Sequence, residues 1–194
     1  MTANAMVDIK FAKVHPNAII PSKRDEDMGF DIYACFDEDY IEIKPHETKL
    51  IPTGIASACS SDYGFLVFER GSTGSKGIAR RCGVIDSGYR NEWFIGLTNT
   101  TDKILYISKI SKEEIVDRTY HSDKMNSSWD SLFGNLISVK ESLEKSIVVY
   151  PYSKAIAQAL VSFVPKTKVE EVSYDELKTI TSERGMGALG SSNK

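Results

Sequence analysis

Short apolar stretches, separated by turn-forming residues, dominate the first hundred positions of the chain. The stretches are rich in Val, Ile, Phe and Tyr, and Gly, Pro, Asp and Ser lie between them. Runs of this kind predict strands, and many short strands at close spacing predict a sandwich or a barrel. The expected strands cover residues 9–14, 30–36, 40–44, 50–59, 65–70, 93–99 and 103–108. The pattern therefore predicts an all-β domain.

A polar and charged segment interrupts the strand pattern after residue 108 and lasts to about residue 147. Within it, apolar residues recur at steps of three and four positions, which places them on one face of a helix. They are Leu132, Leu136, Val139 and Leu143. Asp130 or Ser131 supplies a side chain suited to the N-cap of this helix.

Strand-like sequence returns after the polar segment, at residues 146–153 and 155–164. We therefore interpret residues 108–147 as a partly helical insertion into one β domain. That domain consists of residues 1–107 and 148–182.

The C-terminal part of the chain changes composition again. YDELKTI predicts a short helical turn, whereas residues 183–194 hold glycine, serine and one arginine, and such a tail cannot pack a core. Such a segment is usually a flexible terminus. The stretch RGMGALGSS also combines an arginine, flexible backbone amides and two hydroxyls, which together can hold a phosphate. Both interpretations stay open on this stretch alone.

Charge and cysteine content narrow the class of protein. The formal net charge of −3 argues against a nucleic-acid-binding protein with a broad basic surface. Three cysteines without a CxxC pair argue against structural zinc and favour free thiols in a reducing cytoplasm. The N-terminus lacks the pattern of a signal peptide, and no apolar run reaches the ~18 residues of a membrane span. We expect a cytoplasmic protein without nucleic-acid or membrane partners.

Two stretches carry candidate chemistry. In GVIDSGYRNEW an apolar run delivers Asp86 into a turn, and a turn built from Asp, Ser and Gly is the simpler interpretation. In ERGSTGSKGI, Arg70 follows a strand and precedes flexible amides and hydroxyls that can grip a phosphate. The alternative is a solvated arginine on a surface turn. Lys76, Arg80 and Arg81 add positive charge nearby, which favours a small anionic ligand.

Five stretches, in this order, resemble the five motifs of the homotrimeric dUTPases. GFDIYA is similar to the usual AGYDLYA, RGSTGSKGI to RSGLA with a following Gly-Ile, and GVIDSGYRNE to GVIDxxYRGE. AIAQ is similar to RIAQL, and RGMGALGSS to RGxGGFGST. The resemblance covers nearly the whole chain except the insertion. We expect a phage or bacterial member with an insertion between the third and fourth motifs.

This resemblance implies a distorted jelly-roll fold, a trimer with shared active sites, and hydrolysis of dUTP to dUMP and pyrophosphate. Asp86 would bind and activate the water that attacks the α-phosphorus, and Val84 and Ile85 would anchor its strand. Tyr89 would pack against the deoxyribose and exclude a 2′-hydroxyl. The hairpin of residues 80–84 would read the uracil edge, and the glycine-rich tail would close over the nucleotide.

The remaining roles also follow from the resemblance. The implied substrate-binding residues are Arg70, Gly71, Ser72, Thr73, Arg81, Cys82, Gly83, Val84, Ile85, Tyr89, Gln158, Arg184, Gly187, Leu189, Gly190, Ser191 and Ser192. Asp31 would support the site from behind, although it can equally be a carboxylate that only pairs with an arginine. Gln158 can equally be an ordinary strand residue. Mg²⁺ would be held by the three phosphates rather than by protein ligands.

The chain departs from the usual motifs at four positions. Gly71 stands where serine is usual, so the hydroxyl comes one residue later, at Ser72. Asn91 replaces the glycine of YRGE, and Lys154 stands where arginine is common. Leu189 replaces the phenylalanine that stacks on uracil, a loss of about 1 kcal/mol. We expect a Leu189→Phe variant to have a lower Michaelis constant.

Three other functions compete with this one. dCTP deaminase shares the fold but needs a glutamate general acid and base, and that slot is Gly96 here, with Ser87 in place of a proline. An interaction protein could use the insertion to bind a regulatory partner through Trp129, Leu132, Phe133 and Leu136. An inert jelly roll, such as a capsid protein, would bind no nucleotide.

Overall fold

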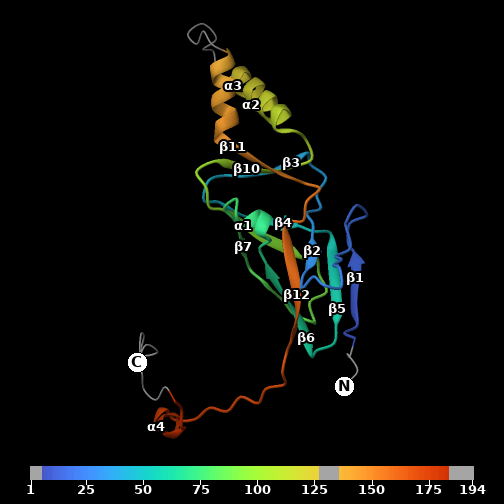
Figure 1. Cartoon of the computed structure of the whole chain (residues 1–194), viewed down its shortest axis with the longest axis vertical. Coiled ribbons are helices and arrows are strands. Elements are labelled where there is room, and N and C mark those ends of the chain that lie inside the picture. The colour runs from blue at the N-terminus through green and yellow to red at the C-terminus, as the bar shows by residue number, and fades with distance from the viewer. Residues whose placement is uncertain (1–5, 127–135, 184–194) are drawn as a thin grey trace. The chain divides into compact units, whose positions relative to one another are not determined.

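The computed structural model describes residues 6–126 and 136–183 (Figure 1). The chain divides into two units, Met1–Val164 and Pro165–Lys194, and each is described here by itself. The strands of the first unit are β1 (Ile9–Lys13), β2 (Phe30–Ile32), β3 (Tyr40–Ile43), β4 (Thr48–Pro52), β5 (Ile55–Cys59), β6 (Tyr63–Phe68), β7 (Ile78–Arg81), β8 (Val84–Ile85), β9 (Phe94–Asn99), β10 (Ile104–Ser108), β11 (Ile147–Pro151) and β12 (Ala157–Phe163). Its helices are α1 (Gly71–Gly74), α2 (Lys112–Asn126) and α3 (Leu136–Ser146).

Small sheets surround one apolar core. Their strand orders are β1-β5, β11-β10-β3, β2-β12-β6-β8 and β4-β9-β7. Strands such as β6 alternate between buried and more exposed residues, whereas β9 is buried at five successive positions. Trp93, directly before β9, is fully buried in the core. Phe11 and Phe65 pack edge-on against its ring, with centroids 5.8 and 4.9 Å away. The prediction of an all-β domain is confirmed.

The expected strand over residues 50–59 is two strands, β4 and β5. Gly54 between them has φ +66°, and a Cβ there would lie 2.8 Å from the Cβ of Ala18 and 2.9 Å from the sulfur of Cys35. Only glycine fits a left-handed residue packed this closely. The single strand was wrong because Gly54 turns the chain at this point.

The insertion is a helical hairpin that packs on the β11-β10-β3 sheet. Figure 1 shows α2 and α3 side by side beyond this sheet. Ile115 and Val116 of α2 are buried against Tyr106 and Ile147, so a small apolar cluster joins the insertion to the strands. No helix in the described ranges is long and apolar enough to cross a membrane.

The helix expected in the insertion corresponds to α3, which begins at Leu136 in the described chain. Its proposed cap residues Asp130 and Ser131, and Leu132, lie outside the described residues. The helix α2 was not predicted. Ion pairs support it: Asp117 accepts a short hydrogen bond from Lys140 of α3, and Arg118 lies 2.7 Å from Asp39.

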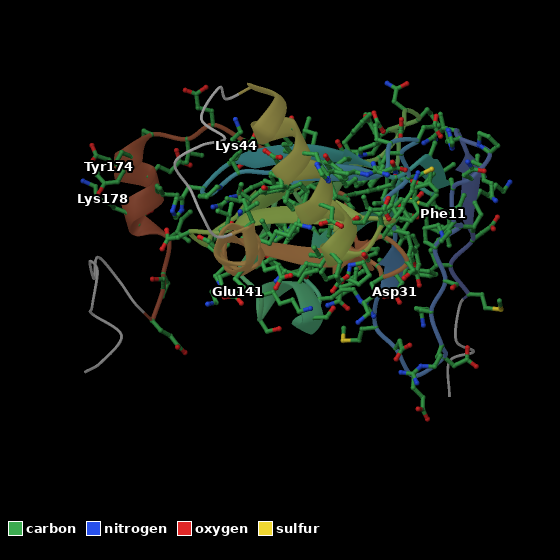
Figure 2. The ribbon with its side chains drawn as sticks, turned by 90° about the horizontal axis from the view of Figure 1, so that it is seen from above. Phe11, Asp31, Lys44, Glu141, Tyr174 and Lys178 are labelled. Atoms are coloured by element: carbon green, nitrogen blue, oxygen red, sulfur yellow. The ribbon has the colours of Figure 1, made fainter. Side chains whose placement is uncertain are left out.

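The second unit contains one short helix, α4 (Tyr174–Thr179), among its described residues. The hydroxyl of Ser173 caps it by accepting a hydrogen bond from the Glu176 amide at 3.1 Å. The ammonium of Lys178 lies 4.9 Å from the ring centre of Tyr174 (both labelled in Figure 2). The predicted helical turn is confirmed. The unit boundary falls at Val164, earlier than the domain end expected at residue 182.

Candidate active site

An arginine, a carboxylate and an amide meet at one edge of the β2-β12-β6-β8 sheet. Cross-strand pairing sets Gln158 beside Asp31 of β2 (labelled in Figure 2) and beside Phe68, the last residue of β6. Arg70 follows, and its guanidinium contacts both carboxylate oxygens of Asp31, with Nε–Oδ1 3.0 Å and Nη2–Oδ2 3.3 Å. The amide of Gln158 donates to the Glu69 carbonyl at 2.8 Å. We call Asp31, Arg70 and Gln158 the anion half-site.

A single helical turn, α1, follows Arg70. Thr73 is buried, and its hydroxyl both accepts from the Arg70 amide and donates to the Arg70 carbonyl, each at 3.0 Å. The side chain of Thr73 therefore shapes the turn, and its expected substrate contact stays a prediction. This hydroxyl fixes the backbone on both sides of Arg70.

The two positions after Arg70 face outward. A Cβ at Gly71 would find no heavy atom of the described chain within 4 Å, so the serine usual in the motif would fit here. The hydroxyl of Ser72 lies 3.3 Å from that of Tyr150, whose own proton goes to the Ala155 carbonyl at 2.7 Å. Ser72 is therefore the donor in this pair, and its oxygen remains able to accept.

Two hollows meet at the anion half-site. One, of about 680 Å³, extends toward the loop before β2, where Lys23 and Arg24 line it. The other, of about 520 Å³, extends past Gly71 and Ser72 to Lys154. Asp31, Arg70 and Gln158 line both. The combined space is polar and holds four cationic side chains beside the carboxylates of Glu26, Asp27 and Asp31. Arg24 pairs with Asp27 and Arg70 with Asp31, and the planar guanidinium of Arg70 suits a phosphorylated ligand.

The chain turns at Cys82 and Gly83 between β7, which pairs with β9, and β8, which pairs with β6. This segment lies beside the end of β6, and we call residues 80–84 the hairpin although its two arms belong to different sheets. The Val67 amide donates to the Gly83 carbonyl at 2.7 Å, and the Arg80 amide donates to a carboxylate oxygen of Glu69 at 2.9 Å. The guanidinium of Arg80 lies 5.7 Å from the ring centre of Phe68 and passes over Gly83, where a Cβ would be 2.1 Å from Nη1. A side chain at position 83 would displace the end of Arg80, and its Cβ would also lie 3.0 Å from the Val67 carbonyl oxygen.

The tip of the hairpin is exposed. Cys82 has φ +54° and an exposed, free thiol. Arg81 donates from Nε to the Thr98 hydroxyl at 3.0 Å, which ties the hairpin to β9. Both residues were expected to bind substrate, through their backbone or side chain. Their backbone lies at the tip, where a flat ligand edge can reach it.

Asp86 and Tyr89 lie on the turn that follows β8. Asp86 is exposed, and its carbonyl accepts from the Tyr89 amide at 3.1 Å. The hydroxyl of Tyr89 donates to the Glu92 carbonyl at 3.0 Å, which fixes the ring. Ile85 packs on the core, but Val84 is 70% exposed. The expectation that both residues anchor the strand was wrong for Val84, because successive strand residues face opposite sides.

The structure does not bring Asp86 to the anion half-site of its own chain. Ile85 pairs with Phe65 in antiparallel register, so Asp86 follows opposite Gly64 near the start of β6, whereas Arg70 follows the other end. Six residues of extended chain separate these ends by about 20 Å. Asp86 and Arg70 of one chain are therefore far apart along the sheet.

Two site residues were missed from the sequence. Glu69 binds both Arg80 and Gln158, and only the neighbouring ERG stretch pointed to it. Gly29 packs on Gln158, since a Cβ there would lie 2.9 Å from its Oε1 and 3.1 Å from its Cβ. Its place in GFDIYA was a signal, because a glycine there leaves space for a neighbouring side chain.

The expected residues of the glycine-rich tail lie outside the described residues. They are Arg184, Gly187, Leu189, Gly190, Ser191 and Ser192. In the parts of the chain that the structure describes, no group of three or more His, Cys, Asp or Glu side chains is placed to hold a metal ion.

Comparison with known proteins agrees with this arrangement. A dUTPase family model matches residues 15–112, just over half of the 194 residues. The deoxyuridine 5'-triphosphate nucleotidohydrolase of Helicobacter pylori (strain P12) is 30% identical over 121 residues, which cover 59% of this chain and 81% of that protein. The enzyme of the same name from Leptospira interrogans serovar copenhageni is 30% identical over 117 residues, 57% of this chain and 80% of the relative.

Solved structures share the fold. The Staphylococcus bacteriophage 80alpha dUTPase with dUPNHPP has a TM-score of 0.65 at 20% identity, covering 96% of this chain and 99% of that one. A mutant of the dUTPase from phage phi11 of S. aureus, whose structure reveals the coordination of a structural Mg(II) ion, has a TM-score of 0.57 at 16% identity, covering 87% of this chain and 99% of that one.

The fold and the site together define an all-β protein with a polar, cation-lined space for a phosphorylated ligand. The chain belongs to the dUTPase family. Phage dUTPases are among the structures with the same fold.

Proposed function

We propose that the protein hydrolyses dUTP to dUMP and pyrophosphate, with Asp86 activating the attacking water. The observation that carries the proposal is the anion half-site, in which Arg70 is held by Asp31 beside Gln158 at the junction of two polar hollows. Membership of the dUTPase family supplies the substrate.

In the proposed reaction the water oxygen bonds to the α-phosphorus while the bond to the bridging oxygen of the β-phosphate breaks. Pyrophosphate leaves with that oxygen, and the water's proton passes to the Asp86 carboxylate and then to solvent. Asp86 suits this role because it is exposed on a turn that its own carbonyl closes with the Tyr89 amide. A fixed carboxylate can hold the water in line with the leaving group.

The phosphates would bind at the anion half-site. Arg70 offers a planar donor fork, and Gly71, Ser72 and Gln158 border the same space. The base would meet the backbone of residues 80–84, and the ring of Tyr89 would cover the deoxyribose and leave no room for a 2′-hydroxyl. The tail residues Arg184, Ser191 and Ser192 would close over the γ-phosphate.

Two observations support a homotrimer with shared sites. Asp86 and Arg70 of one chain lie at opposite ends of β6, so a second chain would supply one of them. The outer face of the β2-β12-β6-β8 sheet carries an apolar row next to the anion half-site: Val84 pairs with Leu66, and Leu66 with Leu160. Leu66 is 36% exposed and Phe68 39% exposed. A partner covering this row would bring its own Asp86 turn to Gln158.

Mg²⁺ would enter with the nucleotide. Asp31 is engaged by Arg70, and the described chain offers no carboxylate cluster, so the ligands would be the phosphates of the substrate. When bound in this way, the ion neutralises phosphate charge and aligns the leaving pyrophosphate.

Deamination of dCTP is disfavoured at Gly96. A Cβ at this position would lie 3.0 Å from the Arg81 carbonyl oxygen and 3.2 Å from its Cβ. The deaminase slot therefore lacks both the carboxylate and the space for one.

The test is pyrophosphate release in the presence of Mg²⁺, from dUTP, dCTP, dTTP and UTP, with wild type and Asp86→Asn. We expect release from dUTP alone and a loss of about 10²-fold or more in the variant. Asp102→Asn, which changes an exposed aspartate before β10, is the matched control. No release from dUTP, or equal release from all four nucleotides, would contradict the proposal.

A further inference from the structure

Glu69 occupies the junction between the two parts of the site. It is the residue between β6 and Arg70, and it is half-buried. Its carbonyl accepts from Gln158 at 2.8 Å, and its carboxylate accepts from the Arg80 amide at 2.9 Å. One residue thus contacts the anion half-site through its backbone and the base-binding hairpin through its side chain.

This contact supports the hairpin on the open side of β7, which is an edge strand. Among the described strands, β7 pairs only with β9, which leaves its other edge without a ladder. The carboxylate of Glu69 takes the place of a strand partner for the Arg80 amide. A hydrogen bond to a charged acceptor is about twice as strong as one between neutral groups.

The electrostatic surroundings favour the charged form of Glu69. Burial tends to raise the pKa of this carboxyl, but hydrogen bonds from the Glu69 and Arg80 amides and the charges of Arg80 and Arg81 outweigh it and lower the pKa overall. The acceptor is therefore a carboxylate at neutral pH.

We propose that Glu69 is a positioning residue that fixes the base-binding hairpin relative to Arg70, so that one residue holds the hairpin and the anion half-site of the same chain in place. The inference rests on the proposed function. In a shared-site trimer these two halves belong to different active sites, so Glu69 also links neighbouring sites through the chain.

The test separates the two halves with partial ligands. dUMP binding reports on the hairpin, and inhibition by pyrophosphate reports on the anion half-site. For Glu69→Ala we expect the dissociation constant of dUMP and the inhibition constant of pyrophosphate each to rise about tenfold or more, since a hydrogen bond to a charged group is lost. Glu69→Gln keeps an oxygen that can accept from the Arg80 amide, so we expect it to recover most of the affinity for both ligands. Glu38→Ala, at an exposed glutamate, is the control.

If Glu69 had a purely structural role, Glu69→Ala would lower the melting temperature without changing the dUMP dissociation constant or the pyrophosphate inhibition constant of the folded enzyme. That result, or weakening of only one ligand, or a Glu69→Gln variant as weak as Glu69→Ala, would overturn the inference. If Glu69→Ala does not fold, Glu69→Asp replaces it, because its carboxylate is too short to reach Arg80, and the same weakening is expected. Failure of the wild type to hydrolyse dUTP would instead refute the proposed function.

Discussion

Gly71 is the residue at which a small change should strengthen ligand binding. A serine there would place a hydroxyl in open space beside Arg70, on a turn without a left-handed φ. One added hydrogen bond to phosphate is worth about 1 kcal/mol, so Gly71→Ser should lower the Michaelis constant for dUTP about fivefold. Steady-state kinetics checks this, with Gly74→Ser on the same turn as control. An equal change in both variants would show a general effect on the turn.

Gly29 should be intolerant of even one methyl group. In Gly29→Ala the new Cβ would push Gln158 away from the Glu69 carbonyl, because it meets both ends of that side chain. We expect the Michaelis constant to rise about tenfold. A double-mutant cycle with Gln158→Ala tests this directly. The Michaelis constant of the double variant should be no higher than that of Gln158→Ala alone. Additive losses would mean that Gly29 acts elsewhere.

Glu69 should make stability depend on pH. Its pKa is lower in the folded state, so the folded protein binds fewer protons than the unfolded chain, and the stabilising contribution is present above the ordinary pKa of 4.5 and lost as pH falls through the lowered value. Glu69→Gln cannot titrate. Thermal melts should therefore show a gap between wild type and Glu69→Gln at neutral pH that closes below 4.5. A constant gap would mean that the carboxylate charge contributes nothing.

At the scale of elements, the insertion connects two parallel neighbours. Ile104 of β10 pairs with Ile147 of β11, so a chain leaving at Ser108 must travel back along the strand, about 13 Å, before β11 begins. Direct joining after deletion of residues 110–145 cannot span this distance and should prevent folding. A linker of about eight Gly and Ser residues spans it.

We expect the linker-bridged deletion to fold and to keep dUTP hydrolysis, since the hollows and the hairpin lie outside the insertion. Its melting temperature should fall, because Tyr106 and Ile147 lose the cover of Ile115 and Val116. Circular dichroism and pyrophosphate release check both points. Loss of activity in a folded variant would assign the insertion a part in the site.

The elements that were predicted and missed differ in where their stability comes from. Strands such as β6 and β12 can be predicted from dense runs of apolar residues. The helix α3 can be predicted because its apolar residues recur every three to four positions. The helix α2 buries only Ile115 and Val116 among its described side chains in the small cluster, and ion pairs to other elements support it, so its local sequence gave little sign of a helix.

The site shows the same limit. Arg70, Asp31 and Gln158 could be proposed from motif resemblance, and the fold then placed them together. The contact of Glu69 with Arg80 joins residues from different strands, and no periodicity in the sequence reports such a contact. The exposure of Val84 likewise depends on which strand lies beside it.

At the scale of the whole molecule, the proposed shared site predicts that two inactive variants can restore each other. Asp86→Asn keeps its anion half-site, and Arg70→Ala keeps its Asp86 turn. After unfolding and refolding as an equal mixture, about a quarter of the sites in a ring-like trimer would combine two intact halves. Pyrophosphate release should therefore return to about a quarter of the wild-type rate. If the refolded mixture is as inactive as each variant alone, the proposal that active sites are shared between chains is contradicted.

Because Asp86 and Arg70 are separated along β6, the activity per chain should depend on the concentration of the protein. If no single chain contains a complete site, active sites form only when chains assemble. The rate per chain then depends on the fraction of chains that are assembled. Dilution below the dissociation constant of the assembly would abolish activity while each chain stays folded. A cell or a phage that makes little of this protein would then gain less activity than its copy number suggests, and doubling expression near that threshold would more than double the rate.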